Sequence, residues 1–357
     1  MTGTLVPLVT EQYQFSTKIR CSRRSPWGIL PHGAGRYCNY RHEKQLVPST
    51  GLASPIPHNG KVAMRTYANN AQLQSAIRTL RQSGQTIAFV PTMGNLHEGH
   101  LKLVRKAATL CDVVVVSIFV NPLQFGANED LDSYPRTMAS DKEKLFSEGA
   151  EILYAPGVEE IYPKGMAAQT QVQVPELADT LCGSNRPGHF NGVTTVVTKL
   201  FNIVQPDIAV FGEKDFQQLS IIRKMVVDLC MPIEIVGVAT SRDEDGLARS
   251  SRNGFLNSEQ RLIAPLIHQT LMNCREAIAC GFDNFLQLES HARMKLLQAG
   301  FEPDYFAIRD AKTLKAVTED TEEVAILAAA KLGSTRLIDN VRLSLNPVSD
   351  WGMLATH

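Results

Sequence analysis

The stretch PTMGNLHEGHLKLV, residues 91–104, lies between two short apolar runs, TIAFV (86–90) and VVVVSIFV (113–120). Neither run alternates apolar with polar residues, as is usual for a strand whose two faces are both buried. The residues between them, GHLKLVRKAATL (99–110), show the periodicity of a helix. A buried strand, a helix and a second buried strand are typical of a βαβ unit. This stretch therefore predicts an α/β fold with a parallel sheet.

Similar elements continue the pattern on both sides of this unit. Further short apolar runs predict more buried strands, and apolar residues at helical spacing predict helices between them. Together they predict a Rossmann-like parallel sheet. The expected strands are 151–155, 207–211 and 233–238, and the expected helices are 69–83, 193–204 and 218–229.

A change of character after Ser241 marks a second part of the chain. The segment 241–254 is polar and contains glycine, which is typical of a linker or a mobile loop. The order of the elements that follow predicts a smaller C-terminal α+β domain. Helices are expected around 258–280 and 284–299, and strands at 305–310, 324–330 and 335–339.

The first 63 residues carry eight Lys or Arg and two acidic residues, a net charge of +6. Prolines interrupt them and no hydrophobic periodicity is sustained, so disorder is expected. They are interpreted as a transit peptide, as a basic arm that touches a partner, or as no natural part of the protein. We favour the last, with translation starting at Met64, because the periodic pattern of helices and strands begins almost immediately after that residue. The expected parts are an extension (1–63), the Rossmann-like domain (64–240), the C-terminal domain (241–346) and a tail (347–357).

Composition excludes several classes of protein. Of 357 residues 44% are hydrophobic, and 36 basic side chains balance 36 acidic ones. A net charge of zero argues against binding of the whole chain to nucleic acid or an anionic membrane. No apolar run approaches the ~18 residues that span a bilayer. The seven cysteines are scattered without a CxxC pair, which indicates a reducing compartment and neither a disulfide framework nor a zinc site. The expected location is the cytoplasm.

The turn after the first apolar run contains two glycines and two histidines. Gly94 allows a sharp turn out of the strand, and Gly99 allows close backbone approach at the helix start. His97 and His100 are three residues apart, so one helical turn presents both on one face. Because the N-terminus of a helix attracts anions, this turn predicts a phosphate site. The alternative is a surface turn with two incidental histidines, and the HEGH spacing does not fit zinc.

Two further strand ends offer groups that bind phosphate. FGEKDFQQL (211–219) contains Lys214, which can neutralise phosphate charge, and Asp215, which can hold a ribose hydroxyl or orient the lysine. GLARSSRNG (246–254) offers serine hydroxyls and the guanidinium of Arg252. Each alone is also compatible with an ordinary polar loop. With the histidine turn they predict a nucleoside triphosphate site, although the chain has no Walker A or GxGxxG sequence.

Polar residues also follow the second apolar strand. Asn121 and Gln124 are expected at the same sheet edge as the histidines, where their amides can hold a polar substrate. Phe125 can pack on an apolar part of that substrate. A glycine-rich loop with Arg186 and His189 is either part of the site or an ordinary loop, and the residues leave both possibilities open.

These motifs resemble those of the pantoate–β-alanine ligase family over about residues 64–345. The HxGH element alone is shared with nucleotidyltransferases and class I aminoacyl-tRNA synthetases. The resemblance implies that pantoate attacks the α-phosphate of MgATP, and that β-alanine then converts the pantoyl adenylate to pantothenate and AMP. It also implies a homodimer, with Mg²⁺ carried by ATP and no metal site of its own. The matching motifs are PTMGNLHEGH, VSIFVNPLQF, YPRT, RPGHF, FGEKDFQQL, IRKMV and SSRNGFL.

The resemblance also implies roles for individual residues. His97, His100, Lys214 and Arg252 are expected to stabilise charge on phosphate, with His100 as the general acid. The expected substrate site consists of Gln124 and Gln218 for pantoate, with Gln124 also near β-alanine, and of Asn121, Pro91 and Phe125. The expected ATP site consists of Met93, Gly94, Asn95, Leu96, His97, Glu98, Gly99, His100, Gly212, Glu213, Lys214, Asp215, Ser241, Arg249, Ser250, Ser251 and Arg252.

The sequence departs from the family's pattern at three positions. Arg249 and Ser241 stand where the family has apolar residues, and Asn191 stands for an arginine. The rival interpretations are a nucleotidyltransferase for a phosphorylated metabolite, a tRNA-charging enzyme and a silent nucleotide-binding protein. The first does not need Gln124 and Gln218 beside an apolar patch. A tRNA-charging enzyme needs a basic RNA-binding domain, whereas residues 64–357 are net acidic. The intact cations and histidines argue against a silent nucleotide-binding protein.

Overall fold

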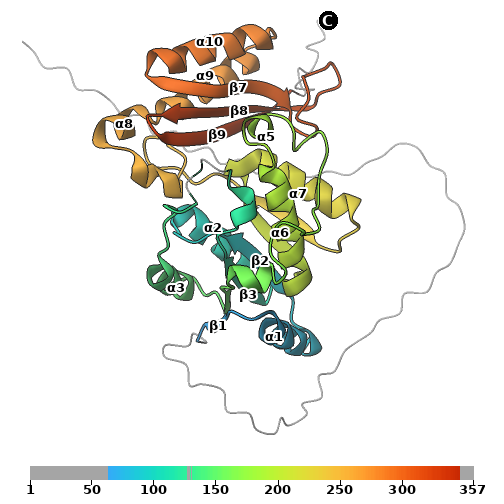
Figure 1. The fold of residues 1–357 in the computed structure, drawn as a ribbon. Coiled ribbons are helices and arrows are strands. Elements are labelled where there is room, and N and C mark those ends of the chain that lie inside the picture. Colours follow the sequence, from blue (N-terminus) through green and yellow to red (C-terminus); the bar gives the residue numbers. More distant parts are fainter. Residues whose placement is uncertain (1–62, 127–128, 130, 346–357) are drawn as a thin grey trace, which may run out of the picture. The chain divides into compact units, whose positions relative to one another are not determined.

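The structure is a computed structural model and describes residues 63–126, 129 and 131–345 (Figure 1). All of these residues belong to one compact unit. The predictions for residues 1–62 and for the tail beyond residue 345 lie outside the described residues. Within the described part, no helix has the length and apolar character needed to cross a membrane.

A six-stranded sheet forms the centre of the first part of the chain, and all its neighbouring strands are parallel. The strand order is β1-β4-β3-β2-β5-β6, which confirms the predicted α/β fold with a Rossmann-like sheet. The strands are β1 Arg65–Tyr67, β2 Ile87–Thr92, β3 Val113–Ile118, β4 Ile152–Tyr154, β5 Ile208–Gly212 and β6 Glu234–Val238.

The central strands are mostly apolar because helices cover both faces of the sheet. Phe89 and Val115 pack in a core with α1, α6 and α7, whereas Val90 and Val116 pack in another core with α2 and α3. Successive residues of a strand point to opposite faces, so each strand contributes to both cores. The helices are α1 Asn70–Gln82, α2 Glu98–Ala108, α3 Met138–Ser147, α4 Val158–Ile161, α5 Cys182–Asn185, α6 His189–Val204 and α7 Phe216–Asp228.

The strand order creates a crevice at the carboxyl edge of this sheet. From β2 the chain adds β3 and β4 on one side, and it later adds β5 and β6 on the other side of β2. The connections after β2 and β5 therefore lead away in opposite directions. In open α/β sheets this is the position where ligands bind. The predicted phosphate-binding segments follow β2, β5 and β6.

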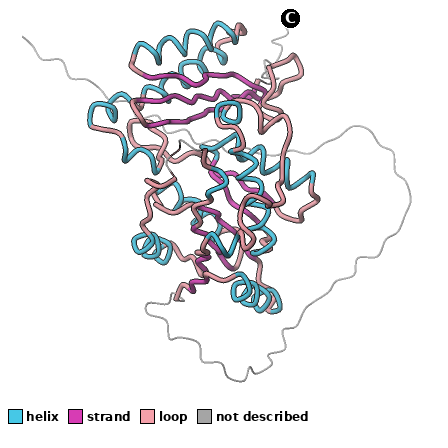
Figure 2. Tube along the Cα trace, viewed as in Figure 1, coloured by secondary structure: helices cyan, strands magenta, loops and turns pink. Residues whose placement is uncertain are grey.

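A three-stranded antiparallel sheet with α9 and α10 on one face makes up the C-terminal part (Figures 1 and 2). Its apolar residues form a third core. This agrees with the predicted helices followed by strands. The elements are α8 Ser258–Ile263, α9 Leu266–Ala279, α10 Phe285–Gln298, β7 Phe301–Asp310, β8 Glu323–Leu332 and β9 Thr335–Ser344.

Some elements differ from the sequence-based prediction. The sequence does not predict β1, which has three residues, or α3, which buries only Asp141 and Leu145. The helix expected over 258–280 is two helices, because Pro265 separates α8 from α9. The expected linker also contains regular structure. Arg242 and Ala248 form an antiparallel bridge, and the 3-10 turn η4 follows at Ser251–Phe255.

Candidate active site

A pocket of about 240 Å³ lies at the carboxyl edge of the six-stranded sheet. Its walls come from the segments that follow β2, β3, β5 and β6 and from helix α6. Most of the predicted site residues line it. They are Pro91, Met93, His97, Gly99, His100, Asn121, Gln124, Gly212, Lys214, Asp215, Gln218, Ser241, Arg249, Ser250, Ser251 and Arg252.

The remaining predicted residues do not line this pocket. Leu96 is 2% exposed and packs in the core with α2 and α3. Glu98 pairs with Arg105 at 2.7 Å, and Glu213 pairs with Arg342 at 3.0 Å. Their side chains are thus occupied within the chain, and a contact with ATP through them stays a prediction. The residues outside the lining are Gly94, Asn95, Leu96, Glu98, Glu213 and Phe125.

The apolar wall of the pocket includes the predicted Pro91 and Met93 but also residues that the sequence does not predict. Phe125 packs edge-on against Tyr134 with ring centroids 5.9 Å apart, and Tyr134 is the one of the two that lines the pocket. Residues spaced by three and four along a helix share one face. The sequence shows this spacing in α6, but only the packing of α6 shows that the face lines the pocket. The residues are Val193, Val196, Val197 and Leu200.

The turn between β2 and α2 is packed so closely that it requires its glycines. Gly94 has a φ of +84°, and a Cβ there would lie 3.0 Å from Ile118. A Cβ at Gly99 would lie 2.8 Å from the ring of His97. Glycine at this position therefore lets the His97 ring lie against the start of the helix.

Asp141 of α3 holds this turn in place. Its buried carboxylate accepts the backbone N–H groups of Asn95 (2.9 Å) and Leu96 (2.8 Å) and the hydroxyl of Thr137 (3.0 Å). Lys144 of the same helix donates to the Leu96 carbonyl (2.7 Å). The sequence does not predict either role, because a charged side chain on a short polar helix is usually solvated. The YPRT motif just before α3 is the only signal that points to this region.

The backbone of the turn fixes the tautomer of both histidines. His97 is the N-cap of α2, and its Nδ1 accepts the N–H of Gly99 at 3.1 Å. The Nδ1 of His100 accepts the N–H of His97 at 3.3 Å. A neutral ring whose Nδ1 accepts a hydrogen bond carries its proton on Nε2. The two rings, with centroids 4.1 Å apart, thus offer a pair of Nε2–H donors.

Burial and nearby positive charge keep both rings neutral. The pKa of His97 is lowered to about 4, first by burial and then by the Lys214 ammonium. The pKa of His100 is lowered to about 3 by burial, by His97 and by Lys214. Desolvation disfavours the charged ring, and like charges disfavour it further. At neutral pH both histidines are therefore hydrogen-bond donors without a charge.

Acidification from pH 7 to pH 5 is expected to destabilise the protein. Unfolded, the two histidines bind protons near their ordinary pKa of 6.5, whereas folded they do so near 4 and 3. The unfolded state therefore takes up more protons as the pH falls, which lowers the free energy of unfolding. Urea titrations at the two pH values should show a smaller fall in His100→Asn, whose Oδ1 can keep the bond to the His97 N–H. Equal falls in both proteins would contradict this account.

Asn121 positions Gln124, which lies on the 3-10 turn η2 (Pro122–Gln124). The Asn121 Nδ2 donates to Gln124 Oε1 (3.2 Å) and to the Gly192 carbonyl (3.1 Å). Its Oδ1 accepts the Tyr162 hydroxyl at 2.7 Å. Both amide hydrogens of Asn121 are used within the chain. Asn121 thus holds Gln124 in place, and a contact of its own with substrate stays a prediction.

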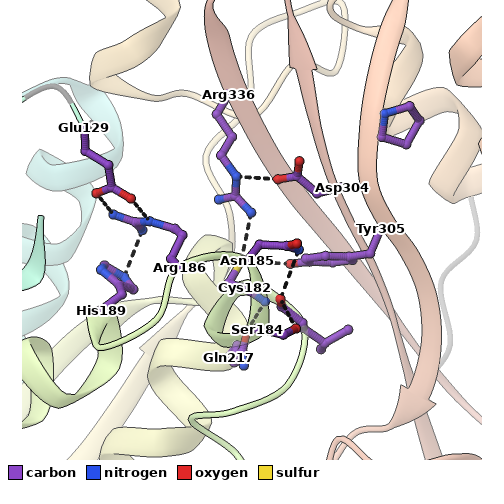
Figure 3. Close-up of polar contacts among 12 residues, drawn as sticks. Glu129, Cys182, Ser184, Asn185, Arg186, His189, Gln217, Asp304, Tyr305 and Arg336 are labelled. Atoms are coloured by element: carbon purple, nitrogen blue, oxygen red, sulfur yellow. Dashed lines mark hydrogen bonds and ion pairs between the residues drawn. The ribbon is translucent and has the colours of Figure 1, made fainter. Parts of the chain in front are cut away.

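Arg186 and His189 also support Gln124. Figure 3 shows the contacts of Arg186 with Glu129 and with His189. The guanidinium of Arg186 donates to both oxygens of Glu129 (2.6 and 2.5 Å), and its Nη1 contacts His189 Nε2 (3.0 Å). The Nδ1 of His189 lies 2.8 Å from the Gln124 carbonyl, which can only accept. Burial, and then Arg186, lower the pKa of His189 to about 4, so this ring is neutral too. The segment from Arg186 to the start of α6 at His189 therefore contacts Gln124 of the site.

Three cationic side chains line the pocket. Lys214 lies in the 3-10 turn η3 (Glu213–Asp215), and among the described residues no side chain pairs with its ammonium. Arg249 lies 2.9 Å from the carboxylate of Asp243. Arg252 lies over the ring of Tyr134, 6.0 Å from its centre. Such a set suits a ligand with several negative charges.

The loop that carries Arg252 is tied to the histidine turn. The Ser251 hydroxyl donates to the carbonyl of Asn95 at 3.2 Å. The Ser250 hydroxyl caps η4 by accepting the N–H of Arg252 at 3.3 Å. Hydrogen bonds thus join the segments after β2 and β6, which the sequence predicts to bind the same triphosphate.

Comparison with known proteins points to one family. The family model described as Pantoate-beta-alanine ligase matches residues 65–342. A pantothenate synthetase from Marinobacter nauticus is 57% identical over 281 residues, which are 79% of this chain and 100% of the relative. One from Pseudomonas putida is 56% identical over 283 residues, 79% of this chain and 99% of the relative.

Two solved structures agree with this. The pantothenate synthetase of Thermus thermophilus superposes with a TM-score of 0.73 at 44% identity, covering 78% of this chain and 99% of its own. A pantoate–β-alanine ligase from Francisella tularensis, complexed with β-γ ATP and β-alanine, gives a TM-score of 0.67 at 35% identity. The match covers 78% of this chain and 97% of that one.

Proposed function

The chain belongs to the pantoate–β-alanine ligase family, and we propose that its reaction runs in this pocket through a pantoyl adenylate. It condenses pantoate with β-alanine using ATP. The supporting observation is that two Nε2–H donors, the cations Lys214 and Arg252 and an apolar wall meet in one pocket. The donors and cations suit a triphosphate. The wall, with Gln124 and Gln218, suits a small branched hydroxy acid.

In the first step the carboxylate of pantoate attacks the α-phosphorus of ATP, and pyrophosphate leaves. A carboxylate is already a nucleophile, so this step needs positioning and charge stabilisation but no general base. Lys214 and Arg252 neutralise charge on the phosphate oxygens, and His97 and His100 donate hydrogen bonds from Nε2. A general-acid role of His100 requires a protonated ring. The negative charge of bound ATP raises the pKa of His100, which favours the protonated ring.

In the second step the amine of β-alanine attacks the acyl carbon of the adenylate. The C–N bond forms, the amine loses a proton, and the bond to AMP breaks. Gln124, held by Asn121 and His189, stays beside the acyl group through both steps.

We propose that Mg²⁺ enters with ATP. Among the described residues that line the pocket, Asp215 supplies the sole carboxylate. No cluster of three metal-binding side chains occurs in the described part of the chain. This donor set fits an ion held mainly by phosphate oxygens, as is usual for Mg²⁺ in nucleotide sites. There the ion would offset negative charge on the phosphates.

Three further proposals extend the family resemblance. They are a homodimer, a cytoplasmic location and domain limits at 64–240 and 241–346. Cys111, Cys182, Cys230, Cys274 and Cys280 are free, which is compatible with a reducing compartment. Light scattering of the purified protein tests the first, and localisation in cells tests the second.

Isotope exchange tests the adenylate. Pantoate without β-alanine should support exchange of labelled pyrophosphate into ATP, and AMP should accumulate only after β-alanine is added. Exchange that ignores pantoate, or that needs β-alanine, would contradict a pantoyl adenylate.

Replacing Arg249 with leucine, the residue type usual in the family, is expected to change the Michaelis constant for ATP by less than about tenfold, or ~1.4 kcal/mol. Its side chain already pairs with Asp243, and its backbone N–H donates to the Ser241 carbonyl at 2.9 Å, a contact that leucine keeps. Initial rates at varied ATP measure the change. A larger effect would show that the guanidinium itself contacts the nucleotide.

A further inference from the structure

Strand β9 of the C-terminal sheet presents two different faces. Successive strand residues point to opposite sides. Leu337, Val341 and Leu343 pack in the C-terminal core with α9 and α10, whereas Ile338 packs in the core of the six-stranded sheet. The side chains at the even positions thus face the first part of the chain. They are Arg336, Ile338, Asn340 and Arg342.

Asn340 on this face is bonded to the segment that carries Lys214. Its Nδ2 donates to the backbone carbonyls of Glu213 (2.9 Å) and Lys214 (2.8 Å). The residue is 7% exposed, so these two bonds are shielded from water. Both amide hydrogens are used, and both acceptors lie in η3, the short turn that leads from β5 to α7.

Arg342 strengthens the same contact. Its Nη2 lies 3.0 Å from the carboxylate of Glu213, and its guanidinium lies over the ring of Phe216, 5.6 Å from the centre. β9 therefore contacts the backbone of η3 through Asn340 and the side chain of Glu213 through Arg342. Arg342 also contacts Phe216, the first residue of α7. No side chain of η3 itself caps the turn.

Asp339, the neighbour of Asn340, holds the other cationic segment. Its fully buried carboxylate accepts two bonds from the guanidinium of Arg242 (2.6 and 2.9 Å). Arg242 pairs with Ala248 in the antiparallel bridge that leads into the loop of Arg249 and Arg252. Adjacent residues of one strand thus fix both segments that bring cations to the pocket.

We propose that Asn340 is a positioning residue for Lys214: its carboxamide sets the backbone of η3, and thereby the place of the ammonium in the pocket. The inference rests on the proposed role of Lys214 in adenylation. It adds a residue of the C-terminal sheet that does not line the pocket and yet affects the first chemical step. A misplacement of about 1 Å at a reacting group can cost about 10²-fold in rate.

The test is a double-mutant cycle on pantoate-dependent pyrophosphate exchange in the full chain. Asn340→Ala should lower the exchange rate roughly 10- to 100-fold. Asn340→Ser, whose hydroxyl has one hydrogen to donate, should lose less. In a Lys214→Ala background, adding Asn340→Ala should cause no further loss, because residues that act through one another are not additive.

Asn284→Ala is the matched control. Asn284 caps α10 by accepting the N–H of Gln287 at 3.1 Å, so this variant also removes a structural asparagine from the C-terminal part. It should lower the melting temperature and leave exchange within about twofold of the parent at 25 °C.

Each outcome of the cycle decides the question. If the Asn340 variants keep normal exchange while Lys214→Ala loses it, the inference is wrong and the proposed function stands. If the two losses multiply in the double variant, Asn340 acts independently of Lys214 and the inference is also wrong. If Lys214→Ala itself keeps normal exchange, the role of Lys214 fails and the inference fails with it.

Discussion

Replacing His100 with alanine is expected to lower pantoate-dependent pyrophosphate exchange by about 10²- to 10³-fold, the usual cost of removing one preorganised donor to developing charge. The ring is neutral, because burial lowers its pKa to about 3, and its Nδ1 is engaged by the His97 N–H. Its Nε2–H is therefore the group that alanine removes from the pocket. Exchange rates at saturating ATP and pantoate measure the loss.

Two amide variants separate the donor from the helix cap. In His100→Asn the side-chain oxygen can occupy the place of Nδ1 and keep the cap, while the Nε2 donor is lost. In His100→Gln the amide nitrogen can reach the place of Nε2. We expect the asparagine variant to be as slow as alanine but more stable, and the glutamine variant to recover part of the rate. Near-normal exchange in His100→Ala would remove this residue from the mechanism.

Replacing Lys214 with methionine is expected to lower the same exchange by about 10²- to 10³-fold. Methionine keeps most of the length of the side chain and removes only the charge. The ammonium lines the pocket, and no described side chain pairs with it, so its charge is available to phosphate. It also lies close enough to lower the pKa of both His97 and His100.

Lys102→Met is the matched control for Lys214. Lys102 lies on α2, does not line the pocket, and donates to the carbonyl of Ala239 at 3.4 Å. The substitution removes one positive charge near the site but none at the proposed phosphate position. Exchange should therefore stay within about threefold of the parent, since the loss of a surface charge usually has a small effect. Equal losses in the two variants would show that general positive potential, not the place of Lys214, matters.

The histidine turn illustrates what sequence patterns predict well. Its glycines and histidines lie within seven residues and interact through a positive φ at Gly94 and the reciprocal bonds of His97 and His100. Local backbone geometry depends on local sequence, so the strand, the turn and the helix start all follow from the pattern. The short apolar strands are similarly readable, because burial on both faces removes polar residues from them.

Other parts of the site have no local signature. Asp141 bonds to Asn95 across 46 positions, and Asn340 bonds to Lys214 across 126. From sequence alone, an acidic residue on a polar helix or an asparagine on a strand cannot be distinguished from an ordinary surface residue. Which groups they meet depends on the strand order and on the packing of the C-terminal sheet, neither of which a short pattern encodes.

The chain's own patterns are enough to identify the parallel sheet, the anion-binding turn and the types of residue that handle phosphate. Periodicity, glycine and helix capping operate over a few neighbouring residues, so they can be read directly. Folding alone brings Lys214, the loop of Arg252 and the apolar face of α6 to one pocket and ties two of them to β9. These contacts arise from long-range packing, in which each residue's partner is chosen by the topology of the whole molecule.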